Sequence, residues 1–213
     1  MSTAPFMPEA EAAHLIERYR DARVILEYGS GGSTRIASQM PGKLILSVES
    51  DRAWTRDLRR EIVQSEPRSQ VILHHVDIGP TGAWGRARDD RSWRQYHRYP
   101  NEVWDMPFFR HPDLILIDGR FRTACLMTAM LRITRPVLVL FDDYSDRPKY
   151  QLVERLLRPE RLIGRMAEFR LQAGMARAQD LGFVFGQYFD VTLHGKTKGV
   201  YKIEDTDKKG PVA

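Results

Sequence analysis

The stretch RVILEYGSGGST, residues 23–34, decides how the chain folds. Its first part, Arg23 to Glu27, is a short run with β-branched members, which is typical of a strand buried on both faces of a sheet. A glycine-rich turn follows, and the polar residues after the turn suit the beginning of a helix. Glycines allow the backbone to approach a ligand closely, and a helix N-terminus offers free N–H groups. The stretch therefore predicts a strand, a ligand-binding turn and a helix, in that order.

The same alternation of strand and helix continues along the chain. Apolar runs predict further strands at residues 43–48, 71–75, 113–117, 137–141, 162–170 and 183–192. Apolar residues at helical spacing predict helices at residues 8–20, 51–64, 121–133 and 147–157. Parallel strands joined by right-handed crossovers give an α/β fold with a doubly wound Rossmann-like sheet. We expect this sheet to be mostly parallel with an antiparallel C-terminal strand, in one domain over residues 1–193 before a polar tail at 194–213.

Composition narrows the function classes. The 213 residues carry a net charge of +5, and arginine supplies 26 of the 33 basic residues. The arginines are interleaved with acids and accompany no recognition motif, which disfavours nucleic-acid binding. A single cysteine, Cys125, excludes an internal disulfide and a thiolate zinc site, and no apolar run approaches the ~20 residues of a membrane helix. We expect a cytoplasmic protein with no membrane partner.

Acidic residues stand at the carboxyl ends of four predicted strands, which is where a doubly wound sheet binds its ligand. They are Glu27, Glu49, Asp77 and Asp118. Glu49 lies 22 residues after Glu27, at the spacing where a nucleotide site uses an acid to accept ribose hydroxyls. The glycine-rich turn lacks the third glycine of the dinucleotide fingerprint and the lysine of a P-loop. Each acid alone could cap a turn or begin a helix, but four in succession favour a ligand site.

This set of features resembles class I S-adenosylmethionine-dependent methyltransferases, and in particular small bacterial methyltransferase-like proteins without an assigned substrate. The first motif of that family, an acid followed by x-G-x-G-x-G, appears at residues 27–33 as EYGSGGS, with Ser33 in place of the last glycine. The resemblance implies bound S-adenosylmethionine, with Glu49 on the ribose, Asp77 near the adenine and Asp118 at the reactive end. The full set of implied cofactor contacts is Glu27, Gly29, Ser30, Gly31, Gly32, Ser33, Glu49, Asp77, Ile78 and Asp118.

A second group of acids follows two neighbouring predicted strands. Asp118 comes after one of them, and Asp142 and Asp143 come after the next. Three converging carboxylates repel one another unless they are protonated or bound to a cation. The arrangement resembles cation-dependent O-methyltransferases, which implies Mg²⁺ held by these three aspartates and an acceptor held or deprotonated by Asp118 or Asp143. The chain departs from that family in having Arg120 and Arg122, and no lysine or histidine, beside Asp118. The alternative is that these arginines neutralise Asp142 or Asp143 through salt bridges.

The function implied by the resemblance is methyl transfer to an unidentified small-molecule acceptor, with O-methylation favoured. Two alternatives stay open: a protein that binds S-adenosylmethionine without turnover, and a nicotinamide-dependent oxidoreductase, which Glu27 and the missing third glycine disfavour. Formation of a homodimer is also left open.

An insertion at residues 78–110 separates the third and fourth predicted strands of the sheet. Connections longer than ~15 residues are usually functional or disordered. Its seven aromatic residues argue against disorder. We expect either a partial lid over an acceptor pocket, with arginines able to hold an anionic acceptor, or a structural insertion that covers a sheet edge or a dimer contact.

Overall fold

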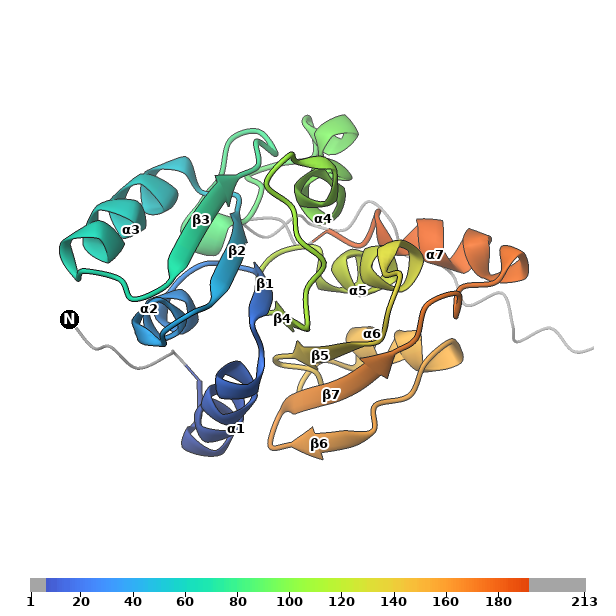
Figure 1. The fold of residues 1–213 in the computed structure, drawn as a ribbon. Coiled ribbons are helices and arrows are strands. Elements are labelled where there is room, and N and C mark those ends of the chain that lie inside the picture. The colour runs from blue at the N-terminus through green and yellow to red at the C-terminus, as the bar shows by residue number, and fades with distance from the viewer. Residues whose placement is uncertain (1–6, 192–213) are drawn as a thin grey trace, which may run out of the picture.

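A seven-stranded sheet runs through the centre of the computed structural model, which describes residues 7–191 (Figure 1). The strand order is β3-β2-β1-β4-β5-β7-β6. The strands are β1 (Val24–Tyr28), β2 (Leu44–Glu49), β3 (Gln70–His75), β4 (Leu114–Ile117), β5 (Val137–Phe141), β6 (Arg161–Ile163) and β7 (Met166–Leu171). Strands β1 to β5 pair in parallel, whereas β7 is antiparallel to both β5 and β6. This confirms the predicted mostly parallel sheet with an antiparallel C-terminal part.

Helices cover both faces of the sheet (Figure 1). The α-helices are α1 (Glu9–Asp21), α2 (Gly32–Gln39), α3 (Arg52–Gln64), α4 (Arg98–Asn101), α5 (Arg122–Arg132), α6 (Pro148–Gln151) and α7 (Leu181–Gln187). Short 3₁₀ helices are η1 (Ala83–Gly85), η2 (Trp93–Gln95), η3 (Glu102–Asp105), η4 (Leu152–Arg155) and η5 (Ala178–Asp180). Within residues 7–191, none of the helices has the length and apolar character that crossing a bilayer requires.

Successive residues of the central strands enter two different cores. Ile25 packs with Tyr19 of α1 on one side of the sheet, while the next residue, Leu26, packs with Met127 of α5 on the other. All four of these side chains are fully buried. Burial of both faces explains why β1, β4 and β5 are continuous apolar runs in the sequence rather than alternating ones.

The structure differs from the sequence prediction mainly in the last third of the chain. Residues 183–192 were predicted as a strand, but they contain most of helix α7. Residue 192 and the predicted tail at 194–213 lie outside the described residues. The run Phe183 to Phe185 suited a strand by propensity, but β6 already occupies this edge of the sheet, and α7 instead buries Val184 against the core beside α5. The strand predicted at 162–170 is the hairpin of β6 and β7, which turns at Gly164 with φ +55°. The helix predicted at 147–157 is the short α6 followed by η4.

The insertion at residues 78–110 is largely part of the core. Six of its side chains are buried in the larger core: Ile78, Ala87, Tyr96, Tyr99, Val103 and Trp104. The Tyr28 hydroxyl of β1 accepts a hydrogen bond from Trp104 Nε1 at 2.7 Å and donates one to the carbonyl oxygen of Pro100 at 2.6 Å. This burial favours the structural alternative for residues 96–104, whereas Trp84, Gly85 and Arg86 of the same insertion line the cavity described below.

The hydroxyl of Tyr28 provides a direct test of this attachment. Replacing Tyr28 by Phe leaves the indole N–H of Trp104 buried without its partner, and an unsatisfied buried donor costs about 1–3 kcal/mol. We expect the Tyr28→Phe variant to lose that much unfolding free energy in urea titrations. Tyr150→Phe is the matched control, since within residues 7–191 the Tyr150 hydroxyl forms no hydrogen bond; equal losses in both variants would contradict the prediction.

Candidate functional site

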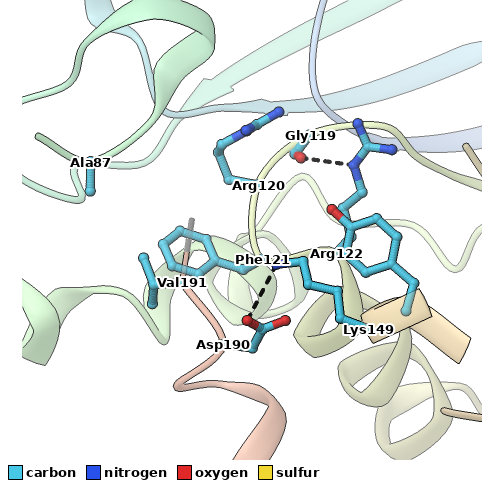
Figure 2. Close-up of a pocket in the computed structure, with 9 residues that line it drawn as sticks. Ala87, Gly119, Arg120, Phe121, Arg122, Lys149, Asp190 and Val191 are labelled. Atoms are coloured by element: carbon cyan, nitrogen blue, oxygen red, sulfur yellow. Dashed lines mark hydrogen bonds and ion pairs between the residues drawn. The ribbon is translucent and has the colours of Figure 1, made fainter. Parts of the chain in front are cut away.

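The carboxyl ends of the parallel strands open into a cavity of about 670 Å³. Its walls come from the loops after β1, β2, β4 and β5, from η1 and from the turn between β6 and β7. A narrower pocket lies beside it, and three residues line both: Gly119, Arg120 and Arg122 (Figure 2). Lys149 and Asp190 form an ion pair at 3.3 Å on the far wall of the narrower pocket.

The floor of the cavity is formed where the loops after β1 and β4 touch. Gly29 has φ +101°, and a Cβ atom at this position would lie only 2.8 Å from the Cα and N atoms of Gly119. A Cβ atom on Gly119 would in turn lie 2.7 Å from the N atom of Gly29. Only glycine on both sides allows this contact, which brings Asp118 next to the glycine-rich turn.

Glu27, predicted as a cofactor contact, lies behind the turn and outside the cavity wall. Its carboxylate is fully buried and accepts hydrogen bonds from the hydroxyls of Tyr19 at 2.6 Å, Thr34 at 2.5 Å and Ser47 at 2.8 Å. Burial raises the pKa of Glu27, and the three hydroxyls oppose this rise. Glu27 of β1 therefore connects α1, α2 and β2 through hydrogen bonds, and these hydrogen bonds stabilise the glycine-rich turn from the side away from the cavity.

Glu49 lies in the cavity wall, at the end of β2. Its Oε1 atom accepts from the backbone N–H groups of Ser50 at 2.6 Å and Asp51 at 2.9 Å, and Oε2 accepts from that of Ser30 at 3.3 Å. Burial raises the pKa of Glu49 against these backbone hydrogen bonds. The carboxylate is thus oriented by two loops, with Oε2 more weakly satisfied than Oε1. Trp54 stands next to it, and its indole N–H donates to the carbonyl oxygen of Ser30 at 2.8 Å.

The structure brings most of the predicted cofactor contacts to this cavity, but not all. Those that line it are Gly29, Ser30, Gly31, Gly32, Ser33, Glu49 and Asp118. Asp77 is exposed and accepts a hydrogen bond from the backbone N–H of Gly79 at 2.8 Å, and Ile78 is fully buried. Neither residue lines the cavity, and nor does Glu27.

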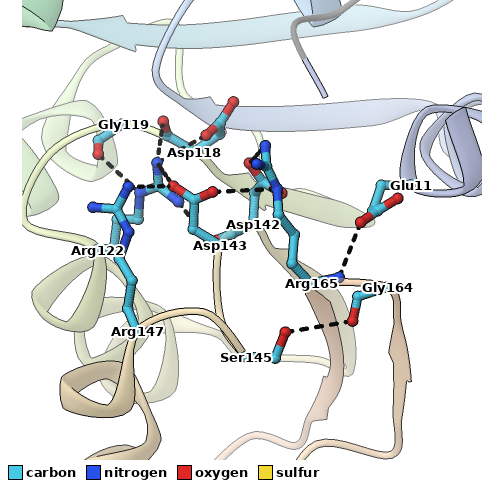
Figure 3. A network of polar contacts seen from close by, with 10 residues as sticks. All are labelled: Glu11, Asp118, Gly119, Arg122, Asp142, Asp143, Ser145, Arg147, Gly164 and Arg165. Carbon is cyan, nitrogen blue, oxygen red and sulfur yellow. Dashed lines mark hydrogen bonds and ion pairs between the residues drawn. The ribbon is translucent and has the colours of Figure 1, made fainter. Parts of the chain in front are cut away.

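Arg122 connects the ends of β4 and β5 (Figure 3). Its Nη2 atom lies 2.9 Å from Oδ1 of Asp118 and 3.2 Å from Oδ2 of Asp143. Its other N–H groups donate to the backbone carbonyl oxygens of Gly119 at 3.1 Å and Asp142 at 2.5 Å. The side chain is only 5% exposed. A buried cation with this many acceptors is stabilised by them, and it holds the carboxylates in a fixed arrangement.

Two further arginines complete the ion-pair cluster. Arg147 lies 2.8 Å from Asp143, and Arg165 lies 3.2 Å from both Asp142 and Asp143 (Figure 3). Arg165 occupies the turn between β6 and β7, and its backbone N–H donates to Glu11 of α1 at 2.9 Å. Because β7 runs antiparallel to β5, this turn lies beside the carboxyl end of β5. The cluster thus pairs three aspartates with three arginines.

This pairing bears on the predicted magnesium site. Asp118, Asp142 and Asp143 do converge, but guanidinium groups already neutralise their charges. In the part of the chain that the structure describes, no group of three or more His, Cys, Asp or Glu side chains is arranged to hold a metal ion. The cluster is the salt-bridge alternative: Arg122 pairs with aspartates as predicted, whereas Arg120 does not take part. The structure does not support the prediction of Mg²⁺.

Asp118 differs from the other two aspartates in its surroundings. Burial, together with the nearby charges of Asp142 and Asp143, raises the pKa of Asp118 to about 7, although Arg122 opposes the rise. About a third of its side chain, 34%, is open to the cavity. A carboxyl group with this pKa can accept or donate a proton at neutral pH.

Among the residues that line the cavity, sequence reasoning missed Trp54, Arg147 and Arg165, whereas Trp84 and Arg86 belong to the insertion for which a partial lid was one of the two alternatives. Trp54 was predicted only as part of the apolar face of a helix, and it is 41% exposed. The position of Trp54 three residues after the N-cap Asp51, one loop from Glu49, was an available signal. Arg165 had no such signal, because only the hairpin brings it to the site.

Comparison with solved structures shows what this chain is similar to. A methyltransferase-like protein from Silicibacter pomeroyi is 44% identical over 88% of this chain and 98% of its own, with a TM-score of 0.83. A methyltransferase from Geobacter sulfurreducens has the same fold, at 10% identity over 79% of this chain and 82% of its own and a TM-score of 0.51. No protein-family model and no curated protein matches the chain.

The raised pKa of Asp118 predicts how stability depends on pH. The ordinary pKa of an aspartate is 3.8, so the folded protein holds the proton of Asp118 more tightly than the unfolded chain does. The free energy of unfolding therefore falls as pH rises from about 4 to about 7, because in this range the carboxyl group ionises in the unfolded chain but stays protonated in the folded protein. Asn at this position is neutral at every pH. We expect urea titrations to show that the unfolding free energy of Asp118→Asn, relative to that of the parent protein, is larger at about pH 8 than at about pH 5.

Asp105→Asn is the control for this experiment. The Arg132 guanidinium lowers the pKa of the exposed Asp105, so this group finishes titrating below the tested range. The Asp105→Asn substitution should therefore change the unfolding free energy by the same amount at about pH 5 and about pH 8. Parallel pH profiles for Asp118→Asn and the parent protein would contradict the raised pKa.

Proposed function

Because the chain belongs to the class I S-adenosylmethionine-dependent methyltransferase superfamily, we propose that it transfers a methyl group from S-adenosylmethionine to a hydroxyl oxygen of a small-molecule acceptor. The observation that carries the acceptor chemistry is the carboxyl group of Asp118, which has a pKa of about 7 and faces the cavity. The cavity volume of about 670 Å³ is within the ~300–1,000 Å³ range of small-molecule sites.

The residues in the cavity fit the cofactor. The free lone pairs of Glu49 Oε2 suit ribose hydroxyls, because its present hydrogen bond, from Ser30 N–H, is long at 3.3 Å. Trp54 offers an exposed aromatic face beside the carboxylate, against which an adenine ring can stack. The glycine-rich turn leaves its backbone open to the ligand, since a Cβ atom on Gly31 would meet only Trp54, at 3.9 Å. We propose these groups, with Gly29, as the cofactor-binding wall.

When bound, S-adenosylmethionine supplies an electrophilic methyl group on a positively charged sulfur. The chain itself must position the acceptor oxygen and remove its proton. Asp118 is the proposed base: its Oδ atoms lie in the cavity wall, and its pKa near 7 matches neutral conditions. Arg122 is a positioning residue that holds the Asp118 carboxylate through the contact at 2.9 Å. Asp143 points to Arg122 and Arg147, so we propose that it orients Arg122 and leaves proton transfer to Asp118.

Binding of S-adenosylhomocysteine tests the cofactor site. We expect calorimetric titration to detect binding of S-adenosylhomocysteine and none of NAD. Glu49→Gln should weaken S-adenosylhomocysteine by about 1.5–3 kcal/mol, because hydrogen bonds to a charged acceptor are worth about that much. Glu17→Gln, an exposed change on α1, is the control and should have no effect. Binding of NAD instead would identify the nicotinamide-dependent alternative, and unchanged affinity in Glu49→Gln would show that this acid only organises its loops.

Turnover separates an enzyme from a protein that only binds the cofactor. With a panel of phenolic and aliphatic alcohols as acceptors, we expect release of S-adenosylhomocysteine whose kcat/KM rises with pH through about 7, since Asp118 must be ionised to act as a base. Asp118→Asn should lower kcat about 100-fold or more while it binds S-adenosylhomocysteine normally. A rate that is unaffected by this substitution would remove Asp118 from the mechanism, and no release with any acceptor would favour the binding protein.

A further inference from the structure

Six arginines line the cavity, and they fall into two groups. Four of them form ion pairs: Arg35, Arg122, Arg147 and Arg165. The other two, Arg86 and Arg120, form no ion pair with any residue in the described range 7–191. Unpaired guanidinium groups in a cavity wall are unusual, because the partly desolvated cations lack a counter-charge.

Arg86 is held in place by its backbone. It directly follows η1, which is attached to the end of β2 through a hydrogen bond of 2.8 Å from the Ser50 hydroxyl to the carbonyl oxygen of Gly85. The Nε atom of Arg86 is buried and has no hydrogen-bond partner. A buried N–H group without an acceptor costs free energy that a bound anion would recover.

Arg120 lies in the loop between β4 and α5. It lines both the cavity and the narrower pocket, and Figure 2 has no dashed contact between its side chain and the other residues drawn there. Burial lowers its pKa, and the positive charges of Arg122 and Arg86 lower it further. Arg86 and Arg120 both line the cavity, and the charge of Arg86 is among those that lower the pKa of Arg120.

We propose that Arg86 and Arg120 form an anion-binding site that selects methyl acceptors carrying a carboxylate or phosphate group next to the methylated hydroxyl. This inference rests on the proposed function of the cavity. Guanidinium groups bind both kinds of anion through paired N–H donors. The nearby aspartates do not oppose an anion, because Arg122, Arg147 and Arg165 neutralise them.

The location of Arg120 favours the acceptor over the cofactor as the source of the anion. Arg120 lines the narrower pocket as well as the cavity, whereas Glu49 and Trp54 line the cavity alone. A ligand held by Arg120 therefore extends away from the wall proposed for the nucleoside. The cofactor also carries a carboxylate, so the experiment has to distinguish these two sources.

The test measures two affinities on the same variants. Inorganic phosphate and benzoate are titrated calorimetrically into protein saturated with S-adenosylhomocysteine, and S-adenosylhomocysteine is titrated separately. We expect R86M and R120M each to weaken both anions about tenfold or more and to leave S-adenosylhomocysteine within about twofold. R88M is the matched control, since Arg88 is exposed on the same segment and donates to the carbonyl oxygen of Thr81. R120K keeps the charge, loses the paired donors and should give an intermediate loss.

Each other outcome is decisive. Weaker S-adenosylhomocysteine binding with unchanged anion binding would assign the arginines to the cofactor carboxylate and overturn the proposal. Anion affinities that are equal in the parent, R86M and R120M, or no anion binding by the parent protein, would also overturn it. Failure of the parent protein to bind S-adenosylhomocysteine would count against the proposed function instead, and phosphate titrated into the protein alone then tests the arginines directly. Circular dichroism checks that each variant is folded before titration. If R120M does not fold, the affinities of R86M and R120K decide the test.

Discussion

The buried guanidinium group of Arg122 is the contact on which the organisation of the site depends. It stands at the first position of α5, where the helix dipole disfavours a cation. The position is tolerated because Asp118 and Asp143 lie within 3.2 Å and the carbonyl oxygens of two loops complete its hydrogen bonds. Without Arg122, the carboxylates at the ends of β4 and β5 would repel each other, and the two loops would lose their shared partner.

Parallel pairing explains why much of the site could be predicted from sequence. Strands that are buried on both faces appear as continuous apolar runs, and their carboxyl ends meet at one edge of the sheet, so the residue after each run faces a common cavity. This reasoning located Glu49, Asp118, Asp142 and Asp143 together with the glycine-rich turn. It also gave the order of strands and helices through β5, apart from α4, and, within one or two residues, the bounds of β1 to β5 and of α1, α3 and α5.

The parts that could not be predicted depend on contacts between distant segments. Glu27 has the motif position of a ligand contact, but the hydroxyls of Tyr19, Thr34 and Ser47 satisfy it behind the turn, and no spacing rule connects those residues. The helix α7 replaced a predicted strand because the sheet edge was already filled by β6, a tertiary effect that overrides local propensity. Arg165 reaches the aspartates only because the hairpin of β6 and β7 reverses direction beside β5.

Charge neutralisation links the proposed base to the choice of acceptor. If the three aspartates were unpaired, their combined negative charge would repel an anionic acceptor from the place where its hydroxyl must meet Asp118. Pairing them with Arg122, Arg147 and Arg165 removes that barrier, while the charges that remain close to Asp118 keep its pKa near 7. Arg86 and Arg120 are then the arginines of the cavity wall that form no ion pair within residues 7–191, while Glu49 and Asp51 are its acids outside the cluster. The same ion-pair cluster thus influences the proton affinity of the proposed base and leaves Arg86 and Arg120 for the proposed anion site.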